Sequence, residues 1–306
     1  MMKVTVIALL LVIDQAIGAT WVYSQGPKGP SNWLNSYAAC GTRAQSPISI
    51  EHENSVANKN LGTFDRSVFT SLPASMELVN NGHALQVNMD GSYTISDRSV
   101  LPNDYKAVQF HLHWAAANKS EGSEHWLNGK QYFAELHVVH YNTKYASIGE
   151  AVNKPDGLAV LGVFVDINDE TNEHFNLLLN PINRVQIPNQ EMTYTSKFSV
   201  ANFLPTDLSE YYRYRGSLTT PPCFDSVVWT VFKEPIHMSR DQARVLQTSL
   251  YDGINSTAKV GGNFRLPQPI NGREVSRPYK SGANPIPLPI FLQITAMLAV
   301  VKTLYF

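Results

Sequence analysis

The chain has 306 residues, of which 43% are hydrophobic and 16% charged, and its formal net charge is −1. This composition is typical of a globular protein, and the length leaves room for one large domain or two ordinary ones. A near-neutral charge provides no electrostatic footprint for nucleic acid, so no nucleic-acid partner is expected. Since neither a repeat nor a low-complexity linker interrupts the middle of the chain, we expect a single domain between two processed ends.

The N-terminal end has the pattern of a secretory signal. Lys3 precedes the apolar stretch 4–13, which is too short to span a bilayer, and small residues at 16 and 18 suit a cleavage site. We interpret residues 1–18 as a signal peptide, with a core helix as the alternative. The folded domain is then expected at residues 19–281.

The middle of the chain consists mostly of strand patterns. Runs rich in β-branched and aromatic residues, each bounded by turn residues, predict strands at 105–114, 132–141, 158–167 and 226–232. The third run is almost continuously hydrophobic, which is typical of a strand that is buried on both faces. Helices are expected only at 170–179 and 239–250, the second beginning with the capping box of Ser239 and Gln242.

The C-terminal end resembles a lipid-attachment signal. Small residues at 281–283 are followed by a short spacer and the apolar stretch 288–301, which is shorter than the roughly twenty residues of a spanning helix. We predict a GPI anchor on Ser281 or Gly282 and removal of residues 282–306. A plain membrane anchor and a docked terminal segment are the alternatives. The predicted location, reached through the secretory pathway, is the extracellular face of the cell membrane.

Cysteines and glycosylation motifs agree with that location. The mature region contains two cysteines, Cys40 and Cys223. An even number in an oxidising compartment predicts one disulfide, with two buried free thiols as the alternative. Asn118 and Asn255 begin glycosylation motifs.

The stretch 109–114, "QFHLHW", places two histidines inside an otherwise apolar strand. Side chains alternate along a strand, so Gln109, His111 and His113 share one face. In the second predicted strand, Glu135 and His137 share a face in the same way. If the two strands are neighbours, three imidazoles converge on one point.

Three neutral ring nitrogens make an open zinc site with a fourth position left for water. Gln109 and Glu135 are then placed to accept hydrogen bonds from the outer nitrogens of the rings. Ordinary hydrogen-bonded histidines are the alternative. His83 follows the turn 80–82, which favours a place at the lip of a cavity, where an imidazole can carry protons.

Several stretches together resemble one family. "QFHLHW", "GSEHWLNGKQYFAELHVVHYN", "NNGH", "GSLTTPPC" and "GNFRLPQP" are similar to the motifs of the α-class carbonic anhydrases, over about residues 21–278. The resemblance implies a mainly β (α+β) single domain. It would have a large central twisted, mostly antiparallel sheet, short surface helices and zinc at the base of a conical cleft. The predicted lipid anchor points to the membrane-attached type-four or type-fifteen enzymes, although a further cysteine pair of the type-four enzymes is absent.

The resemblance assigns roles to particular residues. One Zn²⁺ per chain would be held by His111, His113 and His137. Thr219 would accept the proton of zinc-bound hydroxide and donate to Glu124, while His83 carries protons to solvent. The apolar wall for carbon dioxide would comprise Val139, Val160, Leu218, Val227 and Trp229, and Thr220 would help to bind bicarbonate and inhibitors. The proton water path would comprise Tyr23, Asn81 and Gln86. The family's extracellular members have a disulfide at the positions of Cys40 and Cys223.

The implied reaction is the reversible hydration of carbon dioxide to bicarbonate and a proton by attack of zinc-bound hydroxide. Carbon dioxide, water and bicarbonate are the expected small molecules, and sulfonamides and anions the expected inhibitors. A bicarbonate transporter is a further partner that the resemblance allows. The alternative is a non-catalytic carbonic-anhydrase-related ectodomain that binds a partner. A cupin-type oxygenase is disfavoured because the glutamate that cupins place a few residues after the second histidine is missing.

Overall fold

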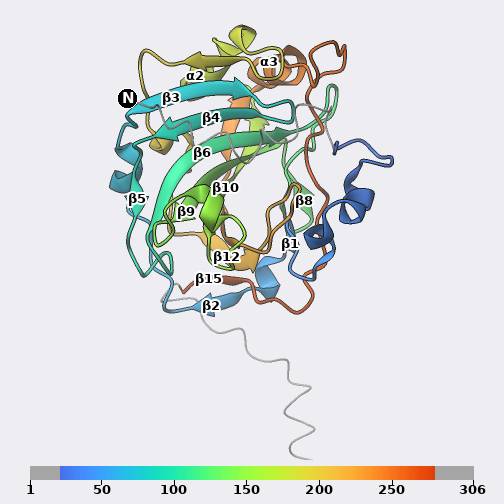
Figure 1. The fold of residues 1–306 in the computed structure, drawn as a ribbon. Coiled ribbons are helices and arrows are strands. Elements are labelled where there is room, and N and C mark those ends of the chain that lie inside the picture. The colour runs from blue at the N-terminus through green and yellow to red at the C-terminus, as the bar shows by residue number, and fades with distance from the viewer. Residues whose placement is uncertain (1–20, 280–306) are drawn as a thin grey trace, which may run out of the picture.

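A 12-stranded sheet runs through the computed structural model of the protein, which describes residues 21–279 (Figure 1). Its main path has the order β11-β3-β4-β6-β9-β10-β13-β12-β15-β2, with β5 pairing β6 and β14 pairing β10. Most pairs are antiparallel, but β10 is parallel to β13 and β14, and β15 is parallel to β2. A second sheet has the order β1-β7-β8. The predicted mainly β domain with a large, mostly antiparallel sheet is confirmed.

The strands are short except at the centre of the sheet. Their bounds are β1 Ser49–Ile50, β2 Val56–Asn58, β3 Ser75–Asn80, β4 Leu85–Asp90, β5 Thr94–Ile95, β6 Tyr105–Trp114, β7 Trp126–Leu127, β8 Lys130–Gln131, β9 Ala134–Asn142, β10 Leu158–Asn168, β11 Glu191–Thr193, β12 Tyr211–Gly216, β13 Val227–Phe232, β14 Ile236–Ser239 and β15 Ser276–Pro278. The helices of the described residues are α1 Ile148–Ala151, α2 Glu173–Leu179 and α3 Arg240–Ser249, besides short 3-10 turns.

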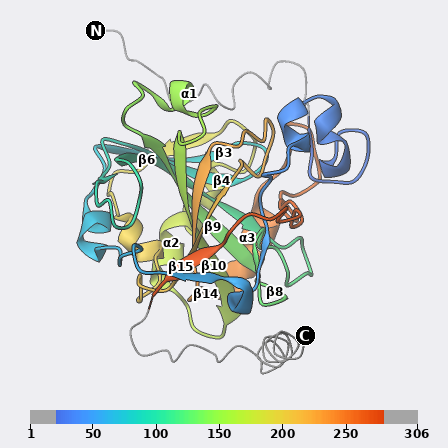
Figure 2. The same ribbon diagram turned by 90° about the horizontal axis from the view of Figure 1, so that it is seen from below.

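All four strands predicted from the sequence are present, and β6 has the predicted bounds. Both predicted helices are also present. Ser239 caps α3 in a complete capping box with Gln242. Helix α2 begins at Glu173, three residues later than predicted, because the Asn172 side chain accepts a hydrogen bond from the backbone of His174 and starts the helix there. Figure 2 shows the short helices outside the sheet.

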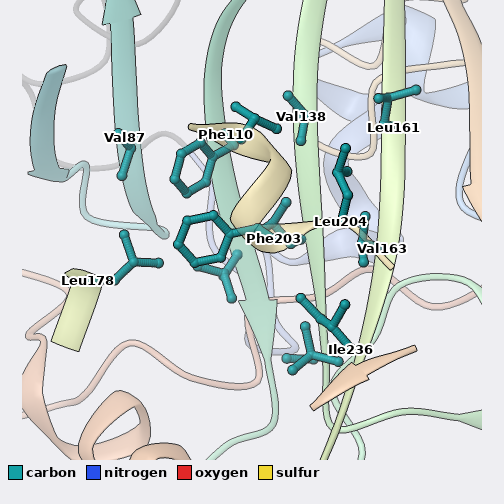
Figure 3. Close-up of a cluster of buried hydrophobic side chains, with 14 of the residues drawn as sticks. Val87, Phe110, Val138, Leu161, Val163, Leu178, Phe203, Leu204 and Ile236 are labelled. Atoms are coloured by element: carbon teal, nitrogen blue, oxygen red, sulfur yellow. The ribbon is translucent and has the colours of Figure 1, made fainter. Parts of the chain in front are cut away.

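One face of the central strands carries the main hydrophobic core. The strand register aligns Val87, Phe110, Val138 and Leu161 in one row across β4, β6, β9 and β10. Figure 3 shows this row covered by side chains from α2 and from the segment near residue 203. A second core cluster lies on the other face, so β10 is buried on both faces from 158 to 165, as its sequence predicts.

The two cysteines form a disulfide that links the N-terminal 3-10 turns to the segment before β13. Cys40 and Cys223 lie 4.8 Å apart at their Cα atoms and are separated by 183 residues. The predicted disulfide is therefore confirmed. Within residues 21–279, no helix combines the length and the apolar character needed to cross a membrane. The predicted signal peptide, Ser281 and the predicted propeptide lie outside the described residues.

Candidate metal centre

Three imidazoles converge where β6 and β9 lie side by side. His111 is the direct cross-strand partner of His137, and His113 is the partner of Glu135. One nitrogen from each of His111, His113 and His137 lies within 4.8 Å of the others. The Nε2 atoms of His111 and His113 are 3.1 Å apart. The structure thus brings together the three histidines that strand alternation places on one face.

Each ring is held by an acceptor on its outer nitrogen. Nδ1 of His111 lies 2.9 Å from Oε1 of Gln109, and Nε2 of His137 lies 2.8 Å from Oε1 of Glu135. Nδ1 of His113 lies 2.7 Å from the backbone carbonyl oxygen of Asn263. An oxygen acceptor requires the proton to be on the outer nitrogen, so each neutral ring turns a lone pair inward.

Burial favours the neutral form of His111 and His113. Burial, reinforced by the neighbouring histidines, lowers the pKa of His111 well below its ordinary value. Burial also lowers the pKa of His113, although Glu124 opposes this shift. Two inward lone pairs only 3.1 Å apart repel each other unless a cation lies between them. Two nitrogen ligands of one tetrahedral zinc ion are roughly 3.3 Å apart, so the donor set fits such an ion.

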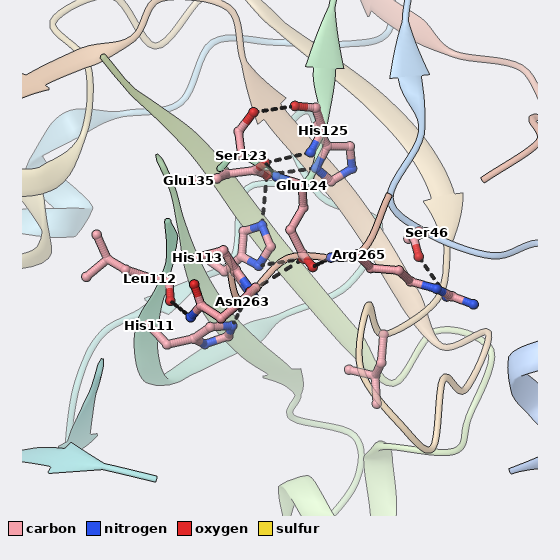
Figure 4. A network of polar contacts seen from close by, with 12 residues as sticks. Ser46, His111, Leu112, His113, Ser123, Glu124, His125, Glu135, Asn263 and Arg265 are labelled. Atoms are coloured by element: carbon pink, nitrogen blue, oxygen red, sulfur yellow. Dashed lines mark hydrogen bonds and ion pairs between the residues drawn. The ribbon is translucent and has the colours of Figure 1, made fainter. Parts of the chain in front are cut away.

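Glu135 is the centre of a buried polar network (Figure 4). Its Oε1 lies 2.7 Å from Nδ1 of His125 as well as near His137, and its Oε2 accepts the backbone N–H groups of Glu124 and His125. A Cβ atom on Gly162 would lie 2.9 Å from Oε1 of Glu135, so the strand beside the carboxylate needs a glycine there. Although burial raises the pKa of Glu135, His125 and His137 lower it well below its ordinary value.

One carboxylate oxygen of Glu124 accepts a hydrogen bond, and the other has no hydrogen-bond partner among the described residues. Oε1 accepts the backbone N–H of Arg265 at 2.8 Å. Oε2 is buried without a hydrogen-bond partner, 3.5 Å from Nε2 of His113 and 3.9 Å from Nδ1 of His137. Thr219 is also buried, but the described residues contain no hydrogen bond between its hydroxyl and Glu124. An unpartnered buried carboxylate oxygen is costly, and it requires a donor at the centre.

Apolar side chains form a wall beside the rings. The register aligns Val139, Val160 and Trp229 across β9, β10 and β13, and Val227 lies two residues before Trp229 on β13. The Trp229 ring centroid is 4.8 Å from that of His137. Leu218, the remaining predicted wall residue, and Thr220, the predicted bicarbonate-binding residue, are half-buried in the segment before β13.

His83 borders a pocket and is linked to this centre through Asn263, whose Nδ2 donates to the backbone carbonyl of His83. Its ring stacks on Trp21 with centroids 3.9 Å apart, and it lines the pocket together with Tyr23 and Asn263. The Tyr23 ring centroid is 6.5 Å from that of His113. The other two residues of the predicted water path are joined to each other and adjoin the centre: Asn81 donates to Gln86, and Gln86 is the cross-strand partner of His111.

Two residues of the centre received no role from the sequence. Asn263 holds His113, and Arg265 holds Glu124 while its guanidinium donates to Gln45 and to the carbonyls of Ser46 and Cys40. Both lie in the "GNFRLPQP" motif, which was a signal of their importance but not of their partners. Away from the centre, the predicted glycosylation residues Asn118 and Asn255 are exposed.

Comparisons with known proteins agree with this geometry. The family model described as eukaryotic-type carbonic anhydrase matches residues 28–279. Human carbonic anhydrase 6 is 36% identical over 277 residues, which cover 89% of this chain and 88% of the relative. Human carbonic anhydrase 12 is 38% identical over a stretch that covers 84% of this chain and 73% of the relative. Mouse carbonic anhydrase 3 is 36% identical over 85% of this chain and 98% of its own.

Proposed function

The chain belongs to the eukaryotic-type carbonic anhydrase family and is a carbonic anhydrase that hydrates carbon dioxide, and we propose that His111, His113 and His137 hold a zinc ion at its reaction centre. The observation that carries the proposal is the orientation of the rings. All three outer nitrogens are committed to oxygen acceptors, so three neutral lone pairs point at one position. Such a donor set leaves a ligand position open for water.

Zinc bound there supplies a water molecule acidic enough to become a nucleophile at neutral pH. The chain orients that nucleophile. Oε2 of Glu124 has no hydrogen-bond partner among the described residues, and in the working centre it would accept a hydrogen bond from the hydroxyl of Thr219. The Thr219 oxygen would then accept a hydrogen bond from the reacting water. This turns a lone pair of the water towards the apolar wall.

The wall suits the substrate. Carbon dioxide is small, neutral and apolar, so Val139, Val160, Val227, Trp229 and the half-buried Leu218 hold it by contact alone. Bicarbonate carries a charge that such a wall does not stabilise, and it leaves when water replaces it. Thr220, at the edge of the wall, binds bicarbonate while it is present.

Each turnover also releases a proton that must reach solvent. His83 accepts it, because an imidazole titrates near neutral pH and this ring lies beside a pocket. Tyr23, Asn81 and Gln86 order the water between the centre and His83. The contact between Asn81 and Gln86 supports this path, since Gln86 lies directly opposite His111.

We place the enzyme at the outer cell surface, as a membrane-attached carbonic anhydrase similar to the type-four and type-fifteen enzymes. Residues 1–18 are the signal peptide, 19–281 the catalytic domain and 282–306 a propeptide replaced by a GPI lipid on Ser281. Exposed Asn118 and Asn255 carry the glycans, and a bicarbonate transporter in the same membrane is a fitting partner. A phosphatidylinositol-specific phospholipase should release the enzyme from intact cells; retention would show another form of attachment.

Stopped-flow hydration of carbon dioxide tests the reaction and its metal together. The purified protein should be active, lose activity on removal of zinc by a chelator, regain it when zinc is restored, and be inhibited by a sulfonamide. Full activity without metal would contradict the proposed centre. An inactive protein with zinc bound would favour the alternative, a non-catalytic ectodomain that binds a partner.

A further inference from the structure

A second pocket, lined by arginines, opens on the face of the sheet away from the metal centre. It has a volume of about 350 Å³ and is lined in part by Arg98, Arg213, Arg215, Ser99 and Asn60; we call it the arginine pocket. Side chains alternate along β12, and the hydroxyl of Tyr214 contacts His125 on the metal side. Arg213 and Arg215, on either side of Tyr214, therefore extend from the opposite face.

Arg213 is a charge with no counter-ion. Its Nε and Nη2 atoms donate to the same acceptor, Oγ1 of Thr230, at 3.2 and 2.8 Å, and its guanidinium lies over the Tyr211 ring. Among residues 21–279, no carboxylate forms an ion pair with it. Burial lowers the pKa of Arg213 to about 10, with the charge of Arg215 acting in the same direction, so Arg213 still carries its charge at neutral pH. A half-buried guanidinium with unused donors favours an anion beside it.

Among the residues that line the pocket, positive charges outnumber negative ones. Arg215 is exposed, and within the described residues its guanidinium makes one long contact, 3.4 Å, from Nη1 to the carbonyl of Pro155. Arg98 pairs with Asp104 at 2.9 Å on the exposed surface. The lining includes one carboxylate, that of Glu274, which is exposed and accepts from the hydroxyl of Ser276 at 2.6 Å. The neutral hydroxyl leaves the charge of Glu274 in place, so Glu274 offsets one of the three arginine charges of the lining.

We propose that the arginine pocket binds a multiply charged oxyanion, a phosphate or sulfate group. The planar guanidinium fork matches two oxygens of such a group, while the amide of Asn60 provides a further donor. The pocket is also roomy enough for the group to be part of a larger molecule. The oxyanion can be a free ion or an ester on a larger ligand, because both present the same oxygens to the fork.

Calorimetric titration of the purified, zinc-loaded protein tests the site. The probes are sodium sulfate, inorganic phosphate and a sulfated disaccharide, each at constant ionic strength set with sodium chloride. Arg213→Gln and Arg215→Gln should each weaken binding of these probes at least tenfold. Arg244→Gln, which removes one exposed positive charge from α3 outside the pocket, should bind as the unaltered protein does. All variants should hydrate carbon dioxide at the unaltered rate, because no pocket arginine touches the metal centre.

The outcomes separate a built site from general attraction of anions. Binding at the metal centre is common to all variants, so the difference between them reports the arginine pocket alone. Equal affinity of Arg213→Gln, Arg215→Gln and Arg244→Gln for every probe would overturn the proposal, as would the absence of binding to the unaltered protein. Tighter binding of the disaccharide than of the free ions would identify an ester ligand, and the reverse a free ion. Arg215→Gln keeps the test decisive if Arg213→Gln fails to fold, since Arg215 is exposed.

Discussion

Oε1 of Glu135 lies 2.8 Å from Nε2 of His137 and 2.7 Å from Nδ1 of His125, so a single carboxylate oxygen holds two buried imidazoles. This arrangement sets the tautomer of His137 and leaves its Nδ1 to face His111 and His113. The carboxylate is fully buried, and the two histidines keep its pKa low against the effect of burial. In the proposed zinc centre, the metal affinity therefore depends on Glu135, which would hold a ligand without being one itself.

Glu135→Gln tests this dependence. The amide is nearly isosteric but uncharged, so His137 loses its ionic acceptor and becomes a weaker ligand. We expect a zinc affinity about 10- to 100-fold lower. Competition with a chelator of known affinity measures it, and Glu173→Gln, an exposed change on α2, is the matched control. An unchanged zinc affinity would show that the contact with His137 is incidental.

His83→Ala should separate the two halves of the catalytic cycle. Removal of the imidazole takes away the proposed proton carrier, but it leaves the three proposed metal ligands and the apolar wall intact. Steady-state hydration should fall by about tenfold or more, while isotope exchange between carbon dioxide and bicarbonate at equilibrium stays close to its original rate. Added imidazole buffer should restore turnover. If buffer has the same effect on the variant as on the unaltered protein, His83 has no part in proton transfer.

His140 should make stability fall in mild acid. Burial lowers the pKa of this fully buried ring from 6.5 to about 4, although hydrogen bonds to the backbone oppose the shift. Its contribution is complete above pH 6.5 and is lost as the pH falls towards 4, because the unfolded chain binds the proton first. The loss is roughly 3 kcal/mol.

The variant His140→Gln isolates this contribution. Glutamine cannot titrate, so the fall in the free energy of unfolding between pH 6.5 and 4 should be smaller by about 3 kcal/mol than in the unaltered protein. Denaturant unfolding at several pH values measures it. If the free energy of unfolding falls equally with pH in both proteins, His140 does not cause the loss of stability.

The disulfide should contribute strongly to stability. Cys40 and Cys223 close a loop across 183 residues of sequence. In the chain-entropy model such a loop stabilises the folded state by about 5 kcal/mol, because it restricts the unfolded chain. The double variant Cys40→Ser with Cys223→Ser should lower the free energy of unfolding by about that amount. A loss below about 1 kcal/mol would show that the cross-link does not restrict the unfolded chain as the model assumes.

Strand alternation was the most productive signal in the sequence. It places Gln109, His111 and His113 on one face of β6, and Glu135 and His137 on one face of β9. The register between these two neighbouring strands brings the five side chains together. Local signals also located α3 from its capping box. These features depend on neighbours in sequence or on a period of two residues, which a single sequence displays directly.

Contacts between distant segments were not predictable in the same way. The carbonyl of Asn263 holds His113 across 150 residues of sequence, and no backbone carbonyl is distinguished from another in a sequence. The arginine pocket likewise joins the segment around residue 98 to β12 and β15, whose proximity depends on the order of strands in the sheet. Helix α2 starts later than predicted because the Asn172 side chain caps it, so the residues before Asn172 stay outside the helix.

The most direct test of the central claim is a crystal structure of the zinc-soaked protein with anomalous data collected on both sides of the zinc absorption edge. We predict one strong zinc peak bounded by Nε2 of His111, Nε2 of His113 and Nδ1 of His137. Absence of that peak at saturating zinc, or the three rings turned away from one another, would contradict the account.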